Sequence, residues 1–297
     1  MHIKYGTIHL NIDVTEICYN KLTNPKNVIR IPAGDGNRAR IFSDPYYGVV
    51  KQIFITFDDA TTIEYDYTKV IYINRLTNEI TIYDINNKIN DLHNKLQIQY
   101  GSFKEELPEQ LMAVRYLTCD EKVLEIGGNI GRNSLIIASI LGNNKNNFVT
   151  LECDPDIATQ LTHNRDLNNM DFHIESSALS NRKLIQKGWD TIASDELLPG
   201  YTNVNIISWT ELNTKYNINF DTLVLDCEGA FYYILMDMPE ILKNISLIIM
   251  ENDYWDISHK NYVNDILIKN KFYVDYSESG GWGPCFNNFF EVWKRDT

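Results

Sequence analysis

The chain has 297 residues and an apolar fraction of 44%, a composition that is typical of a globular protein and excludes wholesale disorder. Its net charge of −13 argues against a nucleic-acid partner, because proteins that bind nucleic acids usually present a basic face. Five widely spaced cysteines without a C-x-x-C pair are typical of a reducing compartment, not of a disulfide framework or a zinc site. The sequence shows no apolar run as long as a membrane span and no signal-peptide core, so we expect a soluble, cytoplasmic protein.

Residues 1–83 consist largely of short β-branched and aromatic runs separated by turn residues. Apolar and polar side chains alternate over 52–57, as in a strand with one solvent-facing side. The cluster G-D-G-N at 34–37 predicts one of the turns. This pattern predicts a small, all-β module resembling a sandwich or barrel. It would bind a carbohydrate or a partner protein, or it would serve only for packing or homodimerisation.

Apolar residues recur at spacings of three and four from Ile85 to Leu96, which predicts a helix. We therefore divide the chain into an N-terminal β-rich module (1–83), a linker helix (84–104) and an α/β domain (105–297). A further helix is predicted at 108–117, before the first strand of that domain.

The sequence V-L-E-I-G-G-N-I-G at 123–131 predicts a buried parallel strand that ends in a glycine-rich turn, and the amphipathic run 134–141 predicts a helix after it. Glycines allow the backbone to approach a ligand, and a helix N-terminus offers free N–H groups. The dinucleotide fingerprint requires glycines at offsets one, three and six, whereas Asn129 and Arg132 occupy the second and third of these positions.

The pattern E-x-G-G-N-x-G instead resembles motif I of class I S-adenosylmethionine (SAM) methyltransferases. The resemblance implies that Glu125 helps to hold the methionine end of SAM and that the turn makes room for the cofactor. The candidate cofactor contacts in the turn are Gly127, Gly128, Asn129 and Gly131. The resemblance also implies that the helix at 108–117 covers the cofactor, so that Tyr100, Glu109 and Gln110 would touch SAM or would simply be surface residues.

A second strand, 148–152, ends in Glu152. A carboxylate at such a strand tip can accept two hydrogen bonds from the ribose hydroxyls of an adenosine. Asp154 opens the next helix and is a further candidate contact. The third strand and its exit span 172–179, and in this fold the exit lies beside the adenine, which makes candidates of Ser177 and Ala178.

Two later strands also end in acids, so three carboxylates are expected at the carboxyl edge of the sheet. We expect Asp226 to position cofactor or substrate, Glu228 to act as the base, and Glu251 to be a second candidate base. Strand-end caps are the structural alternative for Asp226 and Glu228. Clustered acids would also suit a divalent cation such as Mg²⁺, which we do not favour.

The order of these motifs resembles the FkbM family of SAM-dependent O-methyltransferases over residues 105–255. The shared features are the glycine turn, an A-L-S exit from the third strand, W-D-T at 189–191 and L-D-C-E-G-A at 225–230. The chain departs from the family at Phe231, commonly an acid, and at Gly128, commonly an alanine. The resemblance implies a Rossmann-like, mostly parallel seven-stranded sheet with an antiparallel last strand, and methyl transfer to a hydroxyl of a sugar or glycan-like small-molecule acceptor.

The remaining expectations concern the segments 180–208, 279–284 and 31–40. Residues 180–208 form an irregular insertion that ends in a strand at 204–207. The glycine-rich loop 279–284, mobile by composition, borders the substrate. The stretch 31–40 resembles a module found ahead of enzyme domains in giant viruses, which would place the protein in host cytoplasm or a virion.

The rival functions are a glycan- or partner-binding protein with an inactive methyltransferase-like scaffold, which Phe231 favours, and an NAD-dependent oxidoreductase, which the glycine spacing disfavours.

Overall fold

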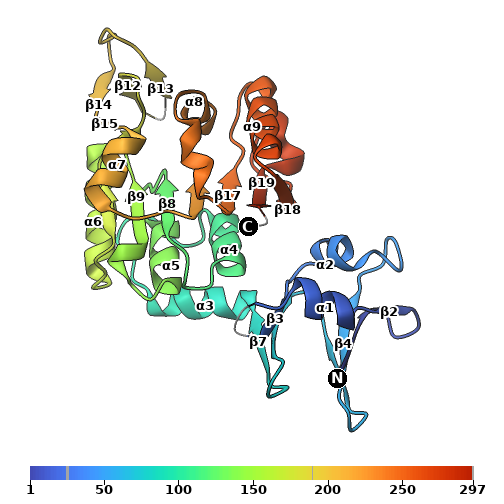
Figure 1. The fold of residues 1–297 in the computed structure, drawn as a ribbon. Coiled ribbons are helices and arrows are strands. Elements are labelled where there is room, and N and C mark those ends of the chain that lie inside the picture. The colour runs from blue at the N-terminus through green and yellow to red at the C-terminus, as the bar shows by residue number, and fades with distance from the viewer. Residues whose placement is uncertain (25–26, 189, 296–297) are drawn as a thin grey trace. The chain divides into compact units, whose positions relative to one another are not determined.

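The computed structural model describes residues 1–24, 27–188 and 190–295. The chain divides into two compact units, Met1–Asp91 and Leu92–Thr297. The division falls inside helix α3 (Ile85–Lys95), the helix predicted from the change in apolar period (Figure 1).

The N-terminal unit contains two antiparallel sheets in its described residues, with strand orders β2-β1-β4-β5 and β3-β6-β7. The strands are β1 (His2–Gly6), β2 (Asn11–Asp13), β3 (Val28–Ile31), β4 (Gln52–Thr56), β5 (Thr62–Tyr65), β6 (Lys69–Asn74) and β7 (Ile80–Asp84). Strand β4 covers the alternating run 52–57, where the predicted strand is confirmed. The core of the unit is a cluster of aliphatic and aromatic side chains from both sheets that includes Ile3, Tyr5, Ile29, Phe42, Ile53 and Ile71.

This unit is not all-β as predicted, because it also contains helices α1 (Thr15–Lys21) and α2 (Asp35–Phe42). The predicted turn at 34–37 is wrong, since α2 begins at Asp35. Glycine and asparagine are poor helix formers, but α2 buries Asn37, Arg38 and Phe42, and this burial outweighs the weak local propensity.

The C-terminal unit is built on a seven-stranded sheet with the order β10-β9-β8-β16-β17-β19-β18. Neighbouring strands are parallel from β10 to β17, and β19 runs antiparallel to both β17 and β18. This order confirms the predicted Rossmann-like class I methyltransferase fold. The strands are β8 (Val123–Ile126), β9 (Phe148–Leu151), β10 (His173–Glu175), β16 (Thr222–Leu225), β17 (Leu247–Glu251), β18 (Phe272–Glu278) and β19 (Phe290–Arg295).

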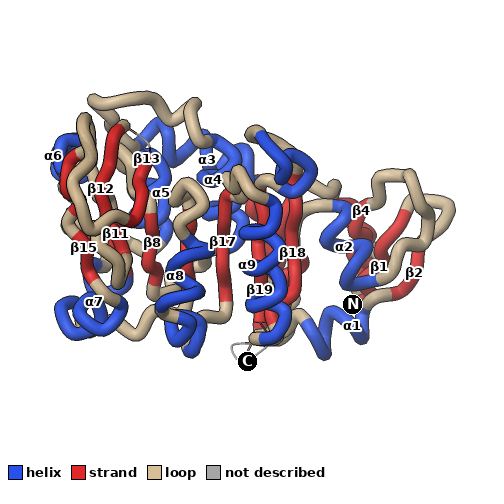
Figure 2. The backbone as a smooth tube through the Cα atoms, turned by 90° about the horizontal axis from the view of Figure 1, so that it is seen from above, coloured by secondary structure: helices blue, strands red, loops and turns tan. Residues whose placement is uncertain are grey.

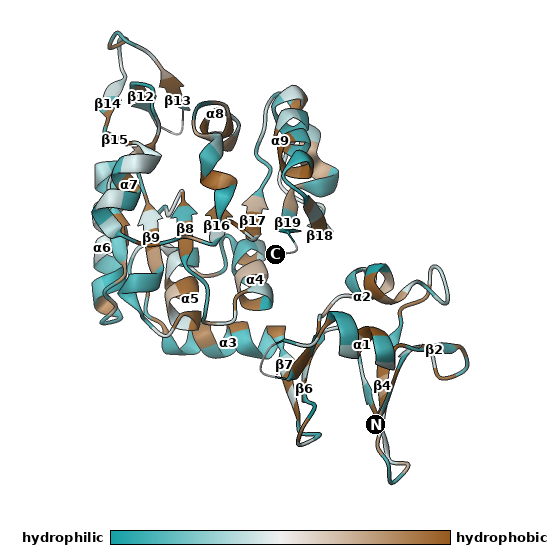
Figure 3. Ribbon diagram, viewed as in Figure 1, coloured by the Kyte–Doolittle hydropathy of each residue, from teal (hydrophilic) through white to brown (hydrophobic). Residues whose placement is uncertain are grey.

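Helices cover both faces of this sheet, with α4, α5 and α6 on one face and α7, α8 and α9 on the other (Figure 2). Strands β8 and β16 are buried along their whole length, while much of α6 is hydrophilic (Figure 3). The helices are α4 (Leu107–Tyr116), α5 (Arg132–Ile140), α6 (Pro155–Leu167), α7 (Trp209–Tyr216), α8 (Phe231–Asp237) and α9 (Ile257–Lys269), with short 3₁₀ turns η1 (Lys145–Asn147), η2 (Pro239–Lys243) and η3 (Gly283–Asn288). In the described part of the chain, no helix has the length and apolar character to cross a membrane.

The described part of the insertion 180–208 contains four short strands, so the prediction of irregular structure is wrong, whereas the strand predicted at 204–207 is present at Ile206–Ile207. Strands β12 (Leu184–Lys187), β13 (Asp190–Ala193) and β14 (Thr202–Val204) form an antiparallel sheet, and β11 (Ala178–Leu179) pairs with β15 (Ile206–Ile207). These strands are short and mostly solvent-exposed. They therefore lack the alternation of apolar and polar residues from which a strand is predicted. Trp189 of the W-D-T sequence lies outside the described residues.

Candidate functional site

The glycine turn lies where the strand order reverses, between β8 and β16, which is where open α/β sheets bind ligands. The N–H groups of Gly127 and Gly128 donate to the carbonyl oxygen of Leu151 at 3.0 and 2.9 Å. Gly127 has φ +91°, and a Cβ there would lie 1.6 Å from the carbonyl oxygen of Asp226. At Gly128 a Cβ would lie 2.2 Å from Thr150 Oγ1. The turn therefore requires glycine at both positions, which explains the departure from alanine at Gly128.

Glu152 holds the turn from the tip of β9. One carboxylate oxygen accepts the N–H of Asn129 and the other accepts the N–H of Asp154, both at 2.9 Å. Each oxygen keeps a second acceptor position, so the carboxylate remains able to accept hydroxyl groups of a ligand. Asp154 has a different role, because its carboxylate caps α6 by accepting the N–H groups of Asp156 and Ile157.

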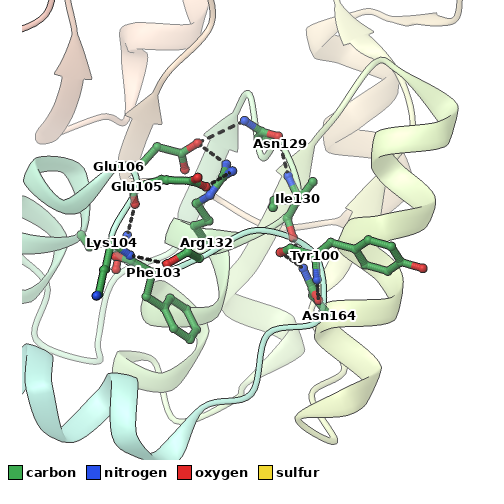
Figure 4. A network of polar contacts seen from close by, with 11 residues as sticks. Tyr100, Phe103, Lys104, Glu105, Glu106, Asn129, Ile130, Arg132 and Asn164 are labelled. Atoms are coloured by element: carbon green, nitrogen blue, oxygen red, sulfur yellow. Dashed lines mark hydrogen bonds and ion pairs between the residues drawn. The ribbon is translucent and has the colours of Figure 1, made fainter.

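The segment 97–106 crosses over the turn and is fastened at two points (Figure 4). At one, the fully buried side chain of Asn164 donates to the carbonyl oxygens of Ile130 and Tyr100 at 2.8 and 3.1 Å. It accepts the N–H groups of Gln99 and Tyr100 at 2.9 and 3.2 Å. All four hydrogen bonds of one amide thus fix the segment to the turn and to α6.

At the second point, Arg132 forms ion pairs with Glu105 and Glu106, the latter at 2.5 Å. Glu106 also accepts the side-chain N–H of Asn129 at 3.1 Å, so the glycine turn, α5 and the start of α4 are joined (Figure 4). Sequence analysis missed Glu106 and Asn164. Asn164 follows the buried Leu161 by three positions and so lies on the buried face of α6, a signal that could have identified it.

A narrow pocket lies beside the turn, between α4 and the carboxyl ends of β8, β16 and β17. Its acidic lining residues are Glu106, Glu109, Glu125, Asp226 and Glu251, and its floor includes Gly127 and Gly128. Across the described residues, no ion pair neutralises Glu109, Glu125, Asp226 or Glu251. The pocket therefore gathers carboxyl groups where the resemblance to motif I predicts the methionine end of the cofactor.

The carboxyl groups in this pocket resist ionisation. Burial raises the pKa of Glu125 to about 7, although its carboxylate accepts the hydroxyl of Ser134. Burial, and next the negative charge of Asp226, raise the pKa of Glu251 to about 11. Burial likewise raises the pKa of Asp226 well above its ordinary value. At neutral pH the pocket thus holds protons that a bound cation would displace.

Glu109 and Glu251 lie within hydrogen-bond reach of each other, an arrangement that favours one proton shared between the two carboxyl groups. Among the described residues, Glu109 Oε2 and Asn133 Oδ1 are buried without a hydrogen-bond partner. Buried acceptors are rarely left unsatisfied, so these atoms are positioned to accept hydrogen bonds from a bound ligand or from water.

Glu228 and Asp253 form a neighbouring acidic site outside the narrow pocket. Asp253 accepts the N–H of Gly229 at 2.8 Å, and burial raises its pKa to about 7. Its other carboxyl oxygen, Asp253 Oδ2, is buried without a hydrogen-bond partner in the part of the chain that the structure describes. Glu228 is exposed, has φ +51°, and loss of hydration raises its pKa. Its left-handed backbone and the link from Asp253 to Gly229 fix the loop that follows β16.

The remaining predicted contacts lie away from the pocket. Gly131 begins α5 with φ +94°. Ser177 Oγ donates to Glu175 at 3.0 Å, and the N–H of Ala178 donates to the carbonyl oxygen of Asn205 at 2.8 Å. Both stand at the exit of β10, so the structure brings Glu125, Gly127, Gly128, Asp226 and Glu251 into one pocket and distributes the other candidates around it.

The acids of this edge do not form a preformed metal centre. Within residues 1–24, 27–188 and 190–295, no group of three or more His, Cys, Asp or Glu residues is arranged to hold a metal ion.

No family model matches the sequence, and no curated protein matches it. Solved structures similar to the chain include the ribosomal protein L11 methylase of Lactobacillus delbrueckii subsp. bulgaricus, with 12% identity, TM-score 0.42, and coverage of 67% of this chain and 82% of that one. An O-methyltransferase from Bacillus cereus in complex with S-adenosylhomocysteine has 14% identity, TM-score 0.40 and coverage of 70% and 88%. Aeropyrum pernix fibrillarin with bound SAM has 10% identity, TM-score 0.40 and coverage of 77% and 94%. Because these identities and TM-scores are low, the similarities carry no argument about the fold. The fold is defined by the strand order of the chain itself.

Proposed function

We propose that this protein is a SAM-dependent O-methyltransferase of FkbM type. The observation that carries the proposal is the glycine turn at the reversal point of a class I methyltransferase sheet, with Glu152 at the adjoining strand tip. A ligand at such a point meets the backbone of the glycine turn, a carboxylate and the start of α5.

The residues present fit SAM. The pocket beside the turn is acidic, has buried acceptors without partners, and SAM carries a sulfonium and an ammonium group. Asp226 and Glu251 would hold the charged methionine end together with Glu125, while Glu152 would hold the ribose. Ser177 and Ala178, at the exit of β10, would adjoin the adenine.

When bound, SAM supplies an electrophilic methyl group, and the protein must orient the acceptor and take its proton. Aligning the two reactants supplies much of the rate enhancement in such reactions. A hydroxyl is a weak nucleophile, so a base beside it is required. Glu228 is our candidate, because it is exposed at the carboxyl edge and its raised pKa strengthens it as a proton acceptor. Glu251 is the second candidate, but its pKa of about 11 keeps it protonated at neutral pH.

The acceptor we propose is the hydroxyl of a neutral sugar or glycan. The carboxyl groups at the carboxyl edge would repel a phosphorylated or carboxylated acceptor, and hydroxyl groups would donate to them. A catalytically inactive scaffold is the second candidate function, because Phe231, where the FkbM pattern has an acid, is 1% exposed and serves the core.

Calorimetric titration of SAM, S-adenosylhomocysteine and NAD into the purified protein tests the proposal. We expect saturable binding of the two adenosyl compounds and none of NAD. Gly127→Ala and Glu152→Ala should each weaken that binding at least tenfold. Gly142→Ala is the matched control for the first variant, because Gly142 also has positive φ but has open space around it. If SAM does not bind, or if Gly127→Ala binds like wild type, the proposal is wrong.

A further inference from the structure

Two tryptophans form an exposed ledge at the carboxyl edge of the C-terminal unit. Trp255 is 83% exposed, and its ring centroid lies 4.2 Å from that of the half-buried Trp282. Trp255 follows β17, whose last residue is Glu251, and Trp282 precedes η3. We call this pair the tryptophan ledge. A large apolar side chain that stays in water contributes little to folding, so the ledge requires another explanation.

The loop that presents Trp255 is firmly anchored. Asn252 is fully buried, its N–H donates to the carbonyl oxygen of Phe289 and its side chain to that of Asn288, both at 2.7 Å. Asp253 accepts the N–H of Gly229, and Tyr254 is 2% exposed. Three consecutive buried residues therefore hold a fourth, Trp255, in solvent.

The second loop is equally confined. A Cβ on Gly280 would lie 2.4 Å from the ring of Phe290, and one on Gly281 would lie 2.2 Å from the ring of Phe289. Gly283 approaches the carbonyl oxygen of Tyr254. Because glycines have no side chains, the loop 279–284 packs closely against the start of β19. The number of glycines predicts a mobile loop, whereas the structure shows a closely packed one. Trp282 is consequently held against Trp255 by packing on both sides.

The ledge is continuous with the candidate base. The hydrogen bond from Gly229 to Asp253 joins the loop that carries Glu228 to the loop that carries Trp255. Two acids adjoin Trp255 in the sequence, since Asp253 precedes it by two positions and Asp256 caps α9 directly after it. Trp255 and Glu228 thus belong to two loops that follow the neighbouring parallel strands β17 and β16 at the same edge of the sheet.

We propose that the tryptophan ledge is the specificity-determining surface for the acceptor and stacks on the apolar face of a neutral sugar ring. This inference rests on the proposed function. The electron-rich indole face attracts the weakly positive C–H groups of a pyranose, and the hydroxyls at the ring's rim donate to Glu228 and its neighbours. An anionic ring would be repelled by the same carboxylates.

The test uses the full chain labelled with 5-fluorotryptophan and followed by fluorine NMR in saturating S-adenosylhomocysteine. The probes are methyl β-D-glucopyranoside, methyl α-L-rhamnopyranoside and methyl β-D-glucuronide. We expect at least one neutral glycoside to shift the resonances of Trp255 and Trp282 saturably, with no shift at the buried Trp293. The glucuronide should bind at least tenfold more weakly than glucopyranoside. Trp255→Phe and Trp282→Phe assign the resonances.

Two variants separate stacking from folding. Trp255→Phe keeps an aromatic face and should retain glycoside binding within about threefold, whereas Trp255→Leu should weaken it about tenfold. Both should bind S-adenosylhomocysteine like wild type. If the adenosyl compound binds but no neutral glycoside shifts the ledge resonances, or if Trp255→Leu binds glycosides normally, the ledge has another role, while cofactor binding still supports methyl transfer. If the adenosyl compound fails to bind, it is the proposed function that fails.

Discussion

The two units of the chain bury charge in opposite ways. In the N-terminal unit, the fully buried guanidinium of Arg38 donates to the carbonyl oxygens of Pro32, Asp66 and Lys69 at 2.9, 3.0 and 2.7 Å. In the C-terminal unit, the buried charge is acidic, and in the described structure its pocket holds no cation for Glu109 or Asp226.

The difference separates structure from function. A buried ion whose hydrogen bonds are satisfied joins segments, as Arg38 joins α2 to Pro32 after β3 and to the residues at the start of β6. A buried acid without a partner destabilises the fold, and such acids cluster at ligand-binding and catalytic sites. The C-terminal unit contains both kinds of buried charge. Lys260 on α9 and Glu291 on β19 form a buried ion pair at 2.5 Å, in which each charge has its partner.

The largest expected effect is in the N-terminal unit. Arg38→Ala leaves three buried carbonyl oxygens without donors, so the free energy of unfolding of this unit should fall by about 3–5 kcal/mol. Denaturant unfolding monitored by circular dichroism measures it. The exposed Arg40→Ala is the control and should change stability by less than about 0.5 kcal/mol. Equal effects of the two substitutions would show that the buried guanidinium is not structural.

Two glutamates on neighbouring strands, the half-buried Glu251 and the buried Glu291, test the contrast within one unit. Glu251→Gln removes a pocket acid that forms no ion pair with the described residues, and it should stabilise the C-terminal unit by about 0.5–2 kcal/mol while weakening SAM binding at least tenfold. Glu291→Gln breaks the pair with Lys260 and should destabilise by about 3–5 kcal/mol. Thermal unfolding and calorimetry measure both. A destabilising Glu251→Gln would mean that this acid is structural.

The same acids predict a pH dependence of stability. Burial raises the pKa of Glu125 and Asp253 to about 7, so the native state binds more protons than the unfolded state between about pH 4.5 and 7. The free energy of unfolding should therefore fall as pH rises through this window. For Glu251, whose pKa is raised to about 11, the fall continues above pH 7.

Urea unfolding at pH 5, 6, 7 and 8 and constant ionic strength checks this slope. The double variant Glu125→Gln with Asp253→Asn should flatten it, and Glu152→Gln, a carboxylate satisfied by two backbone N–H groups, should change it less. Stability that rises with pH in wild type would contradict the assignment of protons to the pocket.

The sheet was predictable because its strands are buried on both faces and are mostly apolar, as at 123–126 and 222–225, where Glu125 and Thr222 are the polar residues. The acids at the strand tips were predictable for the same reason, because a charged residue that ends an apolar strand is expected at the edge of the sheet, outside the core. The pocket was not, because Glu106 enters it from a segment whose path over the turn depends on Asn164 and Arg132. Helix α2 was missed because tertiary contacts of Arg38 stabilise a locally weak helix.

The smallest expected effect on stability comes from Gly36→Ala, and the same substitution at Gly128 in the C-terminal unit provides the comparison. Gly36 lies in helix α2, and nothing lies within 4 Å of the position that a Cβ would take there. Gly36→Ala should therefore stabilise the N-terminal unit by about 0.5 kcal/mol through its higher helix propensity. Gly128→Ala places a methyl group 2.2 Å from Thr150 Oγ1 and 2.9 Å from Leu161 Cδ1. It should destabilise by about 1–3 kcal/mol and weaken SAM binding.

Thr150→Ala removes the nearer obstacle, so the double variant with Gly128→Ala should recover part of both losses. Urea unfolding and calorimetric titration of the four proteins form a double-mutant cycle. Strictly additive effects would show that Thr150 does not constrain the turn. Non-additive effects of Gly128→Ala and Thr150→Ala would show that close packing at the candidate site requires glycine at position 128. A stabilising Gly36→Ala would show that glycine is merely tolerated in helix α2.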